Sequence, residues 1–185
     1  MPVCSALFRY VLHSSSIRSA VAVLAALLCS AAVLAAGEPP DLSREIERIF
    51  RAGDRSLAFQ RIDQAIAAQP DNARLRFLRG VMLSETQREP EAMAVFERLT
   101  QDYPDLPEPY NNLAVLHAAR GQLDSARELL EAALRNDPAY LAARENLGDV
   151  FVRLALRAYE QAGAAARVDA SLQRKLRLVR ELAAR

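Results

Sequence analysis

The sequence has little of the chemistry on which most enzymes and nucleic-acid-binding proteins rely. Its 185 residues include 2 cysteines, 2 histidines and a single lysine, Lys175. The 24 basic residues nearly balance the 23 acidic ones, so no overall field favours a polyanionic partner such as nucleic acid. Both cysteines, Cys4 and Cys29, lie in the first 36 residues. The rest of the chain therefore has no disulfide framework and no thiol chemistry.

The residues after position 36 also offer little for catalysis. The only histidine there is His117, which falls on the inward side of its expected helix and is interpreted as a packed residue. No glycine-rich phosphate loop occurs, and the acidic residues are scattered without a second type of metal ligand. The sequence predicts no catalytic residue, no metal site and no cofactor, and an enzyme with a non-obvious active site stays the rival class.

The first 36 residues contain no acidic residue and differ from everything that follows. Arg9 and Arg18 precede an apolar run, and small residues follow it, which is typical of a secretory signal peptide. We expect residues 1–35 to be removed by cleavage after Ala35. The mature chain would then begin at Ala36 and be exported to the periplasm.

Three alternatives for this segment stay open. Residues 17–36 give 20 mostly apolar residues, about the length that spans ~30 Å of hydrocarbon, so an uncleaved anchor in the inner membrane is one. A lipid on Cys29 is the second, although Leu28 is bulky where such sites have a small residue. A mitochondrial transit peptide is the third, although the apolar run is continuous and not amphipathic.

Beyond this segment, the same residue types return every 34 positions. The sets with this step are Pro70, Pro104 and Pro138; Ala58, Ala92 and Ala126; and Ile62, Phe96 and Leu130. Gly53 and Gly121 are separated by twice the step. Such self-similarity predicts a repeat array, in which each unit buries its apolar face against its neighbours.

Residues 107–140 illustrate how one unit is built from two helices. The residues spaced for one face of a first helix are Tyr110, Leu113, Ala114 and His117. Gly121 ends this helix, and Asp124 is expected to cap a second one. The buried face of the second helix consists of Ala126, Leu130, Ala133 and Leu134. Asp137 and Pro138 are expected to open the next helix, the first as its cap and the second in its first turn.

Small residues are expected where the two helices of a pair approach closely. Ala114 has that place in the unit 107–140, and Gly80 and Gly148 hold it 34 residues to either side. Phe96 and Leu130 are expected to fill the gap toward the next pair. Gly80 and Gly148 are therefore expected to be equivalent.

This pattern resembles the tetratricopeptide repeat. The unit beginning at Pro107 matches that family at Tyr110, Leu113, Ala114, Ala126, Leu130, Ala133 and Pro138. The unit beginning at Ala73 matches it at Gly80, Ala92, Phe96 and Pro104. The resemblance implies an all-α fold, an α-solenoid of stacked antiparallel helix pairs with about four repeats and a C-terminal capping helix.

We expect the repeat domain to cover residues 36–166. Its units are expected at 39–72, 73–106, 107–140 and 141–166. The last unit lacks the turn glycine, so its hairpin is expected to be shortened or distorted. Residues 167–185 are expected to form the capping helix. Its apolar stripe is Leu172, Leu176, Val179 and Leu182, and its basic side is Arg174, Lys175, Arg177 and Arg180.

A stack of helix pairs offers a concave surface lined by the first helix of each pair. The residues at the fifth, sixth and ninth places of the units are Phe77, Leu78, Val81, Asn111, Asn112, Val115, Glu145, Asn146 and Asp149. From these, the candidate peptide-binding residues are Phe77, Val81, Asn111, Asn112, Val115, Asn146 and Asp149. The amides of Asn112 and Asn146 can each donate and accept, as an extended peptide backbone requires. The alternative is that both are solvated or satisfy local groups.

The resemblance also implies what kind of ligand to expect. In this family an asparagine at the sixth place often holds the main chain of a bound peptide. The family's carboxylate clamp needs lysines where this chain has Phe77 and Ala142, so a chaperone C-terminal tail is not the expected ligand. The sequence thus predicts a protein-interaction adaptor or scaffold of the bacterial envelope with a protein or peptide partner and no nucleic acid. The alternative is an envelope assembly factor tethered to the membrane by residues 17–36.

Overall fold

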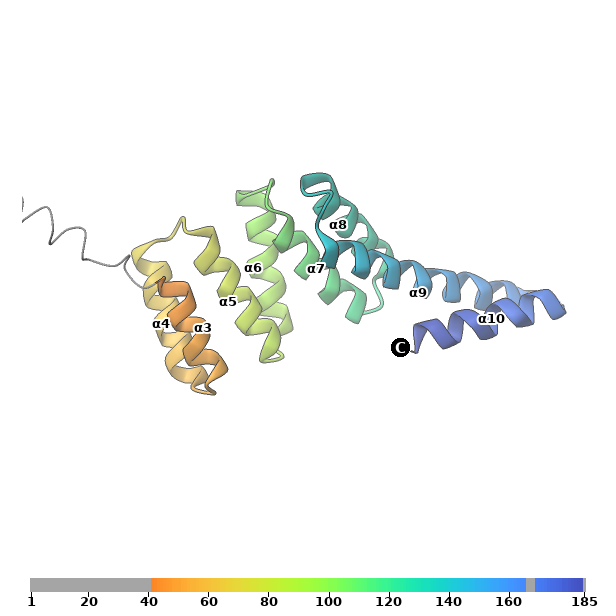
Figure 1. Cartoon of the computed structure of the whole chain (residues 1–185), viewed down its shortest axis with the longest axis horizontal. Helices are drawn as coiled ribbons and strands as arrows, with labels where there is room; N and C mark the ends of the chain where they lie inside the picture. Colours follow the sequence, from red (N-terminus) through yellow and green to blue (C-terminus); the bar gives the residue numbers. More distant parts are fainter. Residues whose placement is uncertain (1–40, 166–168, 185) are drawn as a thin grey trace, which may run out of the picture. The chain divides into compact units, whose positions relative to one another are not determined.

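The computed structural model describes residues 41–165 and 169–184 (Figure 1). Within these ranges all regular structure is helical, which confirms the predicted all-α class. The helices are α3 (Leu42–Arg51), α4 (Arg55–Ala68), α5 (Ala73–Glu85), α6 (Glu89–Asp102), α7 (Pro107–Ala119), α8 (Leu123–Asn136), α9 (Leu141–Ala165) and α10 (Ala170–Ala183). The expected signal or anchor, Cys29 and the start of the first unit at Pro39 lie outside the described residues. The contacts reported below lie within the compact unit 46–185.

The buried side chains form three small cores that follow one another along the chain. From α4 to α10 each helix packs on the next, and α7 also contacts α9. Ile62, Phe96 and Leu130 each belong to a different one of these cores, and their exposed fractions are 0%, 0% and 1%. The 34-residue period therefore marks equivalent buried positions in successive helix pairs, as expected for a solenoid whose units bury apolar surface against their neighbours.

Gly80 lies where two helices of one pair meet. A Cβ atom at this position would lie 2.6 Å, 2.9 Å and 3.1 Å from three ring atoms of Phe96. Contacts below about 3 Å are prohibitive for a packed ring, so α5 and α6 can approach this closely only because position 80 has no side chain. The predicted close approach at Gly80 is confirmed.

The equivalent expectation for Gly148 is wrong. Gly148 is exposed, and a Cβ atom there would have nothing within 4 Å. The reason is that α9 continues as a single 25-residue helix through the region where a turn was expected. No second helix folds back onto Gly148, so the hairpin expected within 141–166 does not form. Instead α10 packs against α9 as a capping helix.

The turns between paired helices explain why α9 does not turn. At one equivalent place in the first three pairs the backbone has a positive φ, with values of 94° at Gly53, 61° at Gln87 and 75° at Gly121. A left-handed residue of this kind commonly ends a helix, and glycine adopts it without steric cost. The next place in the 34-residue series is Ala155, which is helical within α9. Alanine favours continuing the helix, so the fourth turn is absent.

Two of the expected helix caps are also wrong. The N-cap of α8 is Gln122, which makes no side-chain cap hydrogen bond, and Asp124 lies in the first turn instead. Asp137 ends α8, and its Oδ1 accepts a hydrogen bond of 2.9 Å from the backbone N–H of Ala139. Pro138 lies in the turn that this bond stabilises, before α9 begins. Aspartate in such turns competes with capping because it can bond the backbone two residues on.

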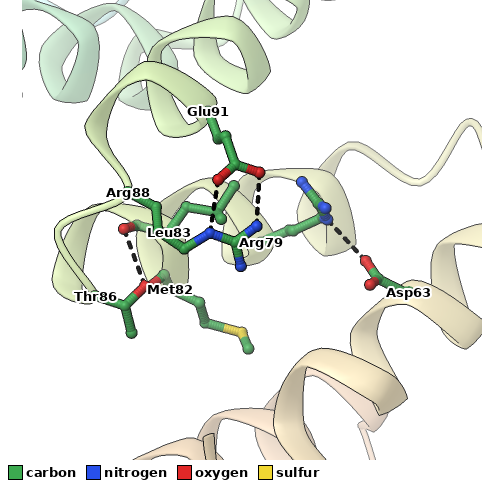
Figure 2. A network of polar contacts seen from close by, with 7 residues as sticks. All are labelled: Asp63, Arg79, Met82, Leu83, Thr86, Arg88 and Glu91. Carbon is green, nitrogen blue, oxygen red and sulfur yellow. Dashed lines mark hydrogen bonds and ion pairs between the residues drawn. The ribbon is translucent and has the colours of Figure 1, made fainter. Parts of the chain in front are cut away.

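Figure 2 shows the turn between α5 and α6 and the ion pairs beside it. The Thr86 hydroxyl donates to the carbonyl oxygens of Met82 at 2.8 Å and Leu83 at 3.1 Å, which satisfies acceptors at the end of α5. Arg88 then donates two hydrogen bonds to Glu91 in the first turn of α6. These bonds hold both sides of the turn, so Gln87 between them keeps its left-handed backbone.

Replacing Gln87 with glycine is expected to stabilise the protein. The left-handed conformation costs a non-glycine residue about 1–2 kcal/mol, part of which is offset by the larger entropy that glycine loses on folding. The net gain in free energy of unfolding should be about 0.5–1 kcal/mol, measured by urea denaturation. Gln87→Ala is the control, because it changes the side chain and keeps the strain. An equal gain from Gln87→Ala would contradict a backbone origin.

Two exposed carboxylates give the fold a weak dependence on acid. Hydrogen bonds from Arg88 hold the pKa of Glu91 below its ordinary value, and hydrogen bonding by Arg76 does the same for the pKa of Asp102. Because both pKa values are lowered in the folded state, these groups contribute stability above their unfolded-state pKa values. That contribution is lost as the pH falls through the folded-state values.

The double variant Glu91→Gln and Asp102→Asn is therefore expected to lose less stability on acidification than the wild type. The difference should be small, because surface ion pairs are screened by solvent. Urea denaturation at neutral and at acidic pH measures it. A steeper acid-side loss in the double variant would show that these carboxylates do not carry the effect.

Candidate peptide-binding face

Two cavities open between the first helices of successive pairs. One lies between α5 and α7, has a volume of about 270 Å³, and is lined by Ala73, Arg74, Phe77, Leu106, Glu108 and Pro109. Its floor is apolar: Phe77 is half-buried and packs on Phe96, with ring centroids 5.7 Å apart. Arg74 and Glu108 bring opposite charges to this cavity, which we call the α5–α7 cavity.

The second cavity lies between α7 and α9 and also has a volume of about 270 Å³. Its lining residues are Ala114, Val115, Ala118, Ala119, Leu130, Asn146, Asp149, Val150 and Arg153. Small alanines of α7 make room for it, and the polar groups come from α9. The α7–α9 cavity therefore combines an amide, a carboxylate and a guanidinium with the side chain of Val115, which is 45% exposed.

Asn111 and Asn146 connect α7 to α9 behind this cavity. The Asn146 Nδ2 donates a hydrogen bond of 2.8 Å to the Oδ1 of Asn111, whose residue is only 6% exposed. A buried amide oxygen needs such a partner. Asn111 is thus a buried support, and Asn146 stands between it and the cavity.

The structure places the remaining candidates elsewhere. Asn112 donates a hydrogen bond of 3.0 Å to the carbonyl oxygen of Glu108, one turn earlier in α7, and it does not line either cavity. Val81 is half-buried against the core that α5, α6 and α7 share. Of the predicted binding residues, the α5–α7 cavity receives Phe77, and the α7–α9 cavity receives Val115, Asn146 and Asp149.

Three charged residues of the cavities were missed by the sequence analysis. Arg74 and Glu108 occupy the second place of their units, 34 residues apart, and Arg153 lies one turn after Asp149. The repeat pattern could have found the first two. Each lies three residues before the fifth place of its unit, and residues three apart share one side of a helix. Arg153 precedes the expected turn at Ala155 and lies four residues after the ninth-place Asp149, so extending that side of the first helix by one turn could have found it.

His117 is half-buried and its Nδ1 lies 2.6 Å from the Oε1 of Gln122, in the turn that follows α7. Across residues 41–165 and 169–184, no group of three histidine, cysteine or acidic side chains is arranged to hold a metal ion. None of the helices in these ranges has the length and apolarity needed to cross a bilayer.

Comparison with protein families gives two matches, both to models of the tetratricopeptide repeat. They cover residues 50–107 and 88–147, which together run from the end of α3 through the pairs α5–α6 and α7–α8 to the start of α9. No curated protein matches the sequence.

Several solved structures share the fold at low sequence identity. The first repeat domain of Spaghetti (RPAP3), bound to the HSP90 peptide SRMEEVD, is 18% identical with a TM-score of 0.56, over 62% of this chain and 90% of that one. The first repeat domain of human RPAP3 gives 18%, 0.57 and the same coverage. YrrB, described as a repeat protein with an unusual peptide-binding site, is 22% identical with a TM-score of 0.51, over 62% of this chain and 59% of its own. At these identities the likeness is one of fold.

Proposed function

We propose that this chain, which belongs to the tetratricopeptide repeat family, is a protein-interaction adaptor. It would bind a peptide segment of its partner along α5, α7 and α9. The observation that carries the proposal is the pair of cavities of about 270 Å³ between these first helices, both lined by residues that the repeat register had selected. The RPAP3 domain with its bound peptide supports the same class of ligand for this fold.

The two cavities suit different parts of an extended peptide. Phe77, Leu106 and Pro109 offer the α5–α7 cavity a surface for a large apolar side chain, which would be removed from water on binding. In the α7–α9 cavity, Asn146 keeps its Oδ1 and one amide hydrogen for the peptide main chain while it bonds Asn111. Asp149 and Arg153 add an acceptor and a donor on the same side of α9. The ligand is therefore a segment with one large apolar residue and an extended main chain.

A random peptide library displayed on phage tests this proposal with the full chain as bait. We expect the selected peptides to share one large apolar residue. In calorimetric titration, their affinity should fall by about tenfold for Phe77→Ala and for Asn146→Ala, because each removes a central contact. The peptide SRMEEVD should not bind measurably, since Phe77 and Ala142 occupy the places where the family's clamp has lysines.

Arg177→Ala is the matched control, because this exposed residue lies on α10 and lines neither cavity. The affinity of the Arg177→Ala variant for the selected peptides should equal that of the wild type. Unchanged affinity in both the Phe77 and the Asn146 variants would move the binding site away from α5, α7 and α9.

We place this adaptor in the bacterial envelope because residues 1–35 have the charge and apolar pattern of a secretory signal. The alternative, an assembly factor tethered to the membrane, is favoured by the 20 mostly apolar residues from 17 to 36. Sequencing the amino terminus of the chain isolated from cells distinguishes the two. A start at Ala36 supports export with cleavage, and a start at Met1 or Pro2 supports the tether.

A further inference from the structure

The long helix α9 has three faces, and two of them are covered. The first packs on α7 and α8, where Ala143 and Val150 are 0% and 3% exposed. The second faces α10: Lys175 lies over the ring of Tyr159 at 5.9 Å from its centroid, and Arg180 pairs with Glu160 at 3.1 Å. Among the helices that the structure describes, none covers the remaining side of α9.

The third face is apolar except for one arginine and is made mostly of small residues. Its members recur at the three- and four-residue spacing of a helical stripe, and they are Leu141, Arg144, Gly148, Phe151, Ala155, Ala158 and Ala162. Leu141 is 65% exposed and Phe151 is 48% exposed, although both are large apolar side chains. We call this surface the open face of α9.

Helix α5 has a glycine at the place that is equivalent to Gly148 of α9. On α5 the equivalent glycine, Gly80, receives the ring of Phe96 from the paired helix α6. On α9 the glycine is present at position 148, but the paired helix is not, because no turn forms at Ala155. The open face is therefore a continuation of the internal helix-packing surface that is left uncovered at the end of the array.

We propose that the open face of α9 binds the same face of a second copy of this chain, with the two α9 helices antiparallel about a two-fold axis. In that arrangement Phe151 of each copy fills the space at Gly148 of the other. One glycine and one phenylalanine lie a single turn apart on this face, so the surface is complementary to itself, as an isologous interface requires.

The rest of the face fits the same register. With the axis midway between positions 148 and 151, Leu141 lies opposite Ala158, and Arg144 lies opposite Ala155. Each larger side chain thus meets a small one, which lets the helices pack closely. Arg144 is the only charged residue of the face and donates a hydrogen bond to the carbonyl oxygen of Pro138 in its own chain. No like charges of the open face oppose each other across the axis.

Self-association through this face leaves the proposed peptide site free. Asn146, Asp149 and Arg153, which line the α7–α9 cavity, lie on the other side of α9 from Gly148 and Phe151. A dimer would therefore present two copies of the peptide-binding face. This inference does not depend on the proposed function, because the open face and the two cavities share no residue.

A swap of the large and small residues tests the interface in the full chain. We expect a dimer for the wild type by sedimentation velocity. Gly148→Phe gives the face two large rings, Phe151→Gly gives it none, and each should weaken dimerisation by about tenfold or more. Mixing the two variants, one of them tagged, should restore association, because two rings on one helix then meet two glycines on the other. Circular dichroism checks that each variant keeps its helices.

Val115→Ala is the matched control, since it trims an exposed apolar residue that lies away from the open face. It should leave the dimer unchanged. A wild-type chain that stays monomeric at every soluble concentration overturns the proposal. So does a dimer that persists undiminished in both single variants, because a surface that neither substitution changes would then hold it together.

Discussion

Gly80→Ala is expected to lower the free energy of unfolding by about 1–3 kcal/mol, because a methyl group there overpacks the site. The Phe96 ring lies 2.6 Å from the position that the new Cβ atom would occupy, and Phe96 is fully buried. At protein concentrations where the chain is monomeric, Gly148→Ala is expected to raise the same free energy by about 0.5–1 kcal/mol, since it replaces an exposed helical glycine without meeting any atom of its own chain. Urea denaturation of both variants decides the signs.

A second substitution shows whether the Phe96 ring is the cause. Phe96→Leu removes ring atoms near Gly80, so in that background Gly80→Ala should cost less than in the wild type. The double variant should therefore be more stable than the sum of the two single losses predicts. Gly148→Ala should change the free energy of unfolding by the same amount with and without Phe96→Leu. A Gly80→Ala variant as stable as the wild type, or one whose cost does not change in the Phe96→Leu background, would contradict overpacking against the Phe96 ring.

These two glycines show both the reach and the limit of the repeat pattern. The period alone assigns Gly80 and Gly148 to the same role, because they are separated by two full steps. Whether a glycine meets a partner depends on the turn that brings the second helix back. The turn series runs through Gly53, Gln87 and Gly121 and ends at Ala155. The missing glycine was visible in the sequence, but it predicted a distorted hairpin rather than a straight helix.

Gln87 forms a left-handed turn that its residue type does not predict. Glycine is the usual residue at such a position, and glutamine is not. The turn forms all the same, because Thr86 and Arg88 bond the helices on either side of it and the cores of α5 and α6 require the helices to pair. Tertiary packing thus overrides the local preference of one residue, at a cost of about 1–2 kcal/mol.

The candidate site was predicted in part for the same reason. The register selects the positions that face outward from first helices, and Phe77, Val115, Asn146 and Asp149 do line the cavities. It cannot distinguish Asn112 from Asn146, which occupy the same place in adjacent units. Their surroundings differ because Asn146 meets the buried Asn111 across the helix interface, whereas Asn112 bonds only its own helix. A pairing of residues 35 apart lies outside any pattern of period 34.

Asn146→Ala is therefore expected to lower the free energy of unfolding by about 1–2 kcal/mol, whereas Asn112→Ala should change it by less than about 0.5 kcal/mol. Loss of the Asn146 amide leaves the Oδ1 of Asn111 buried without that donor. Loss of the Asn112 amide removes only one donor from the carbonyl oxygen of Glu108, which lies one turn earlier in the same helix.

Thermal and urea denaturation of the two single variants measure this difference, and Asn111→Ala completes a double-mutant cycle. If the 2.8 Å bond carries the effect, the cost of Asn146→Ala should nearly vanish in the Asn111→Ala background. Equal costs for the two asparagines in the wild-type background would contradict it. Asn146 also faces the α7–α9 cavity. The affinity of the Asn146→Ala variant for the peptide therefore has to be titrated well below its melting temperature. Under those conditions the whole population is folded, so a loss of affinity does not come from unfolding of the variant.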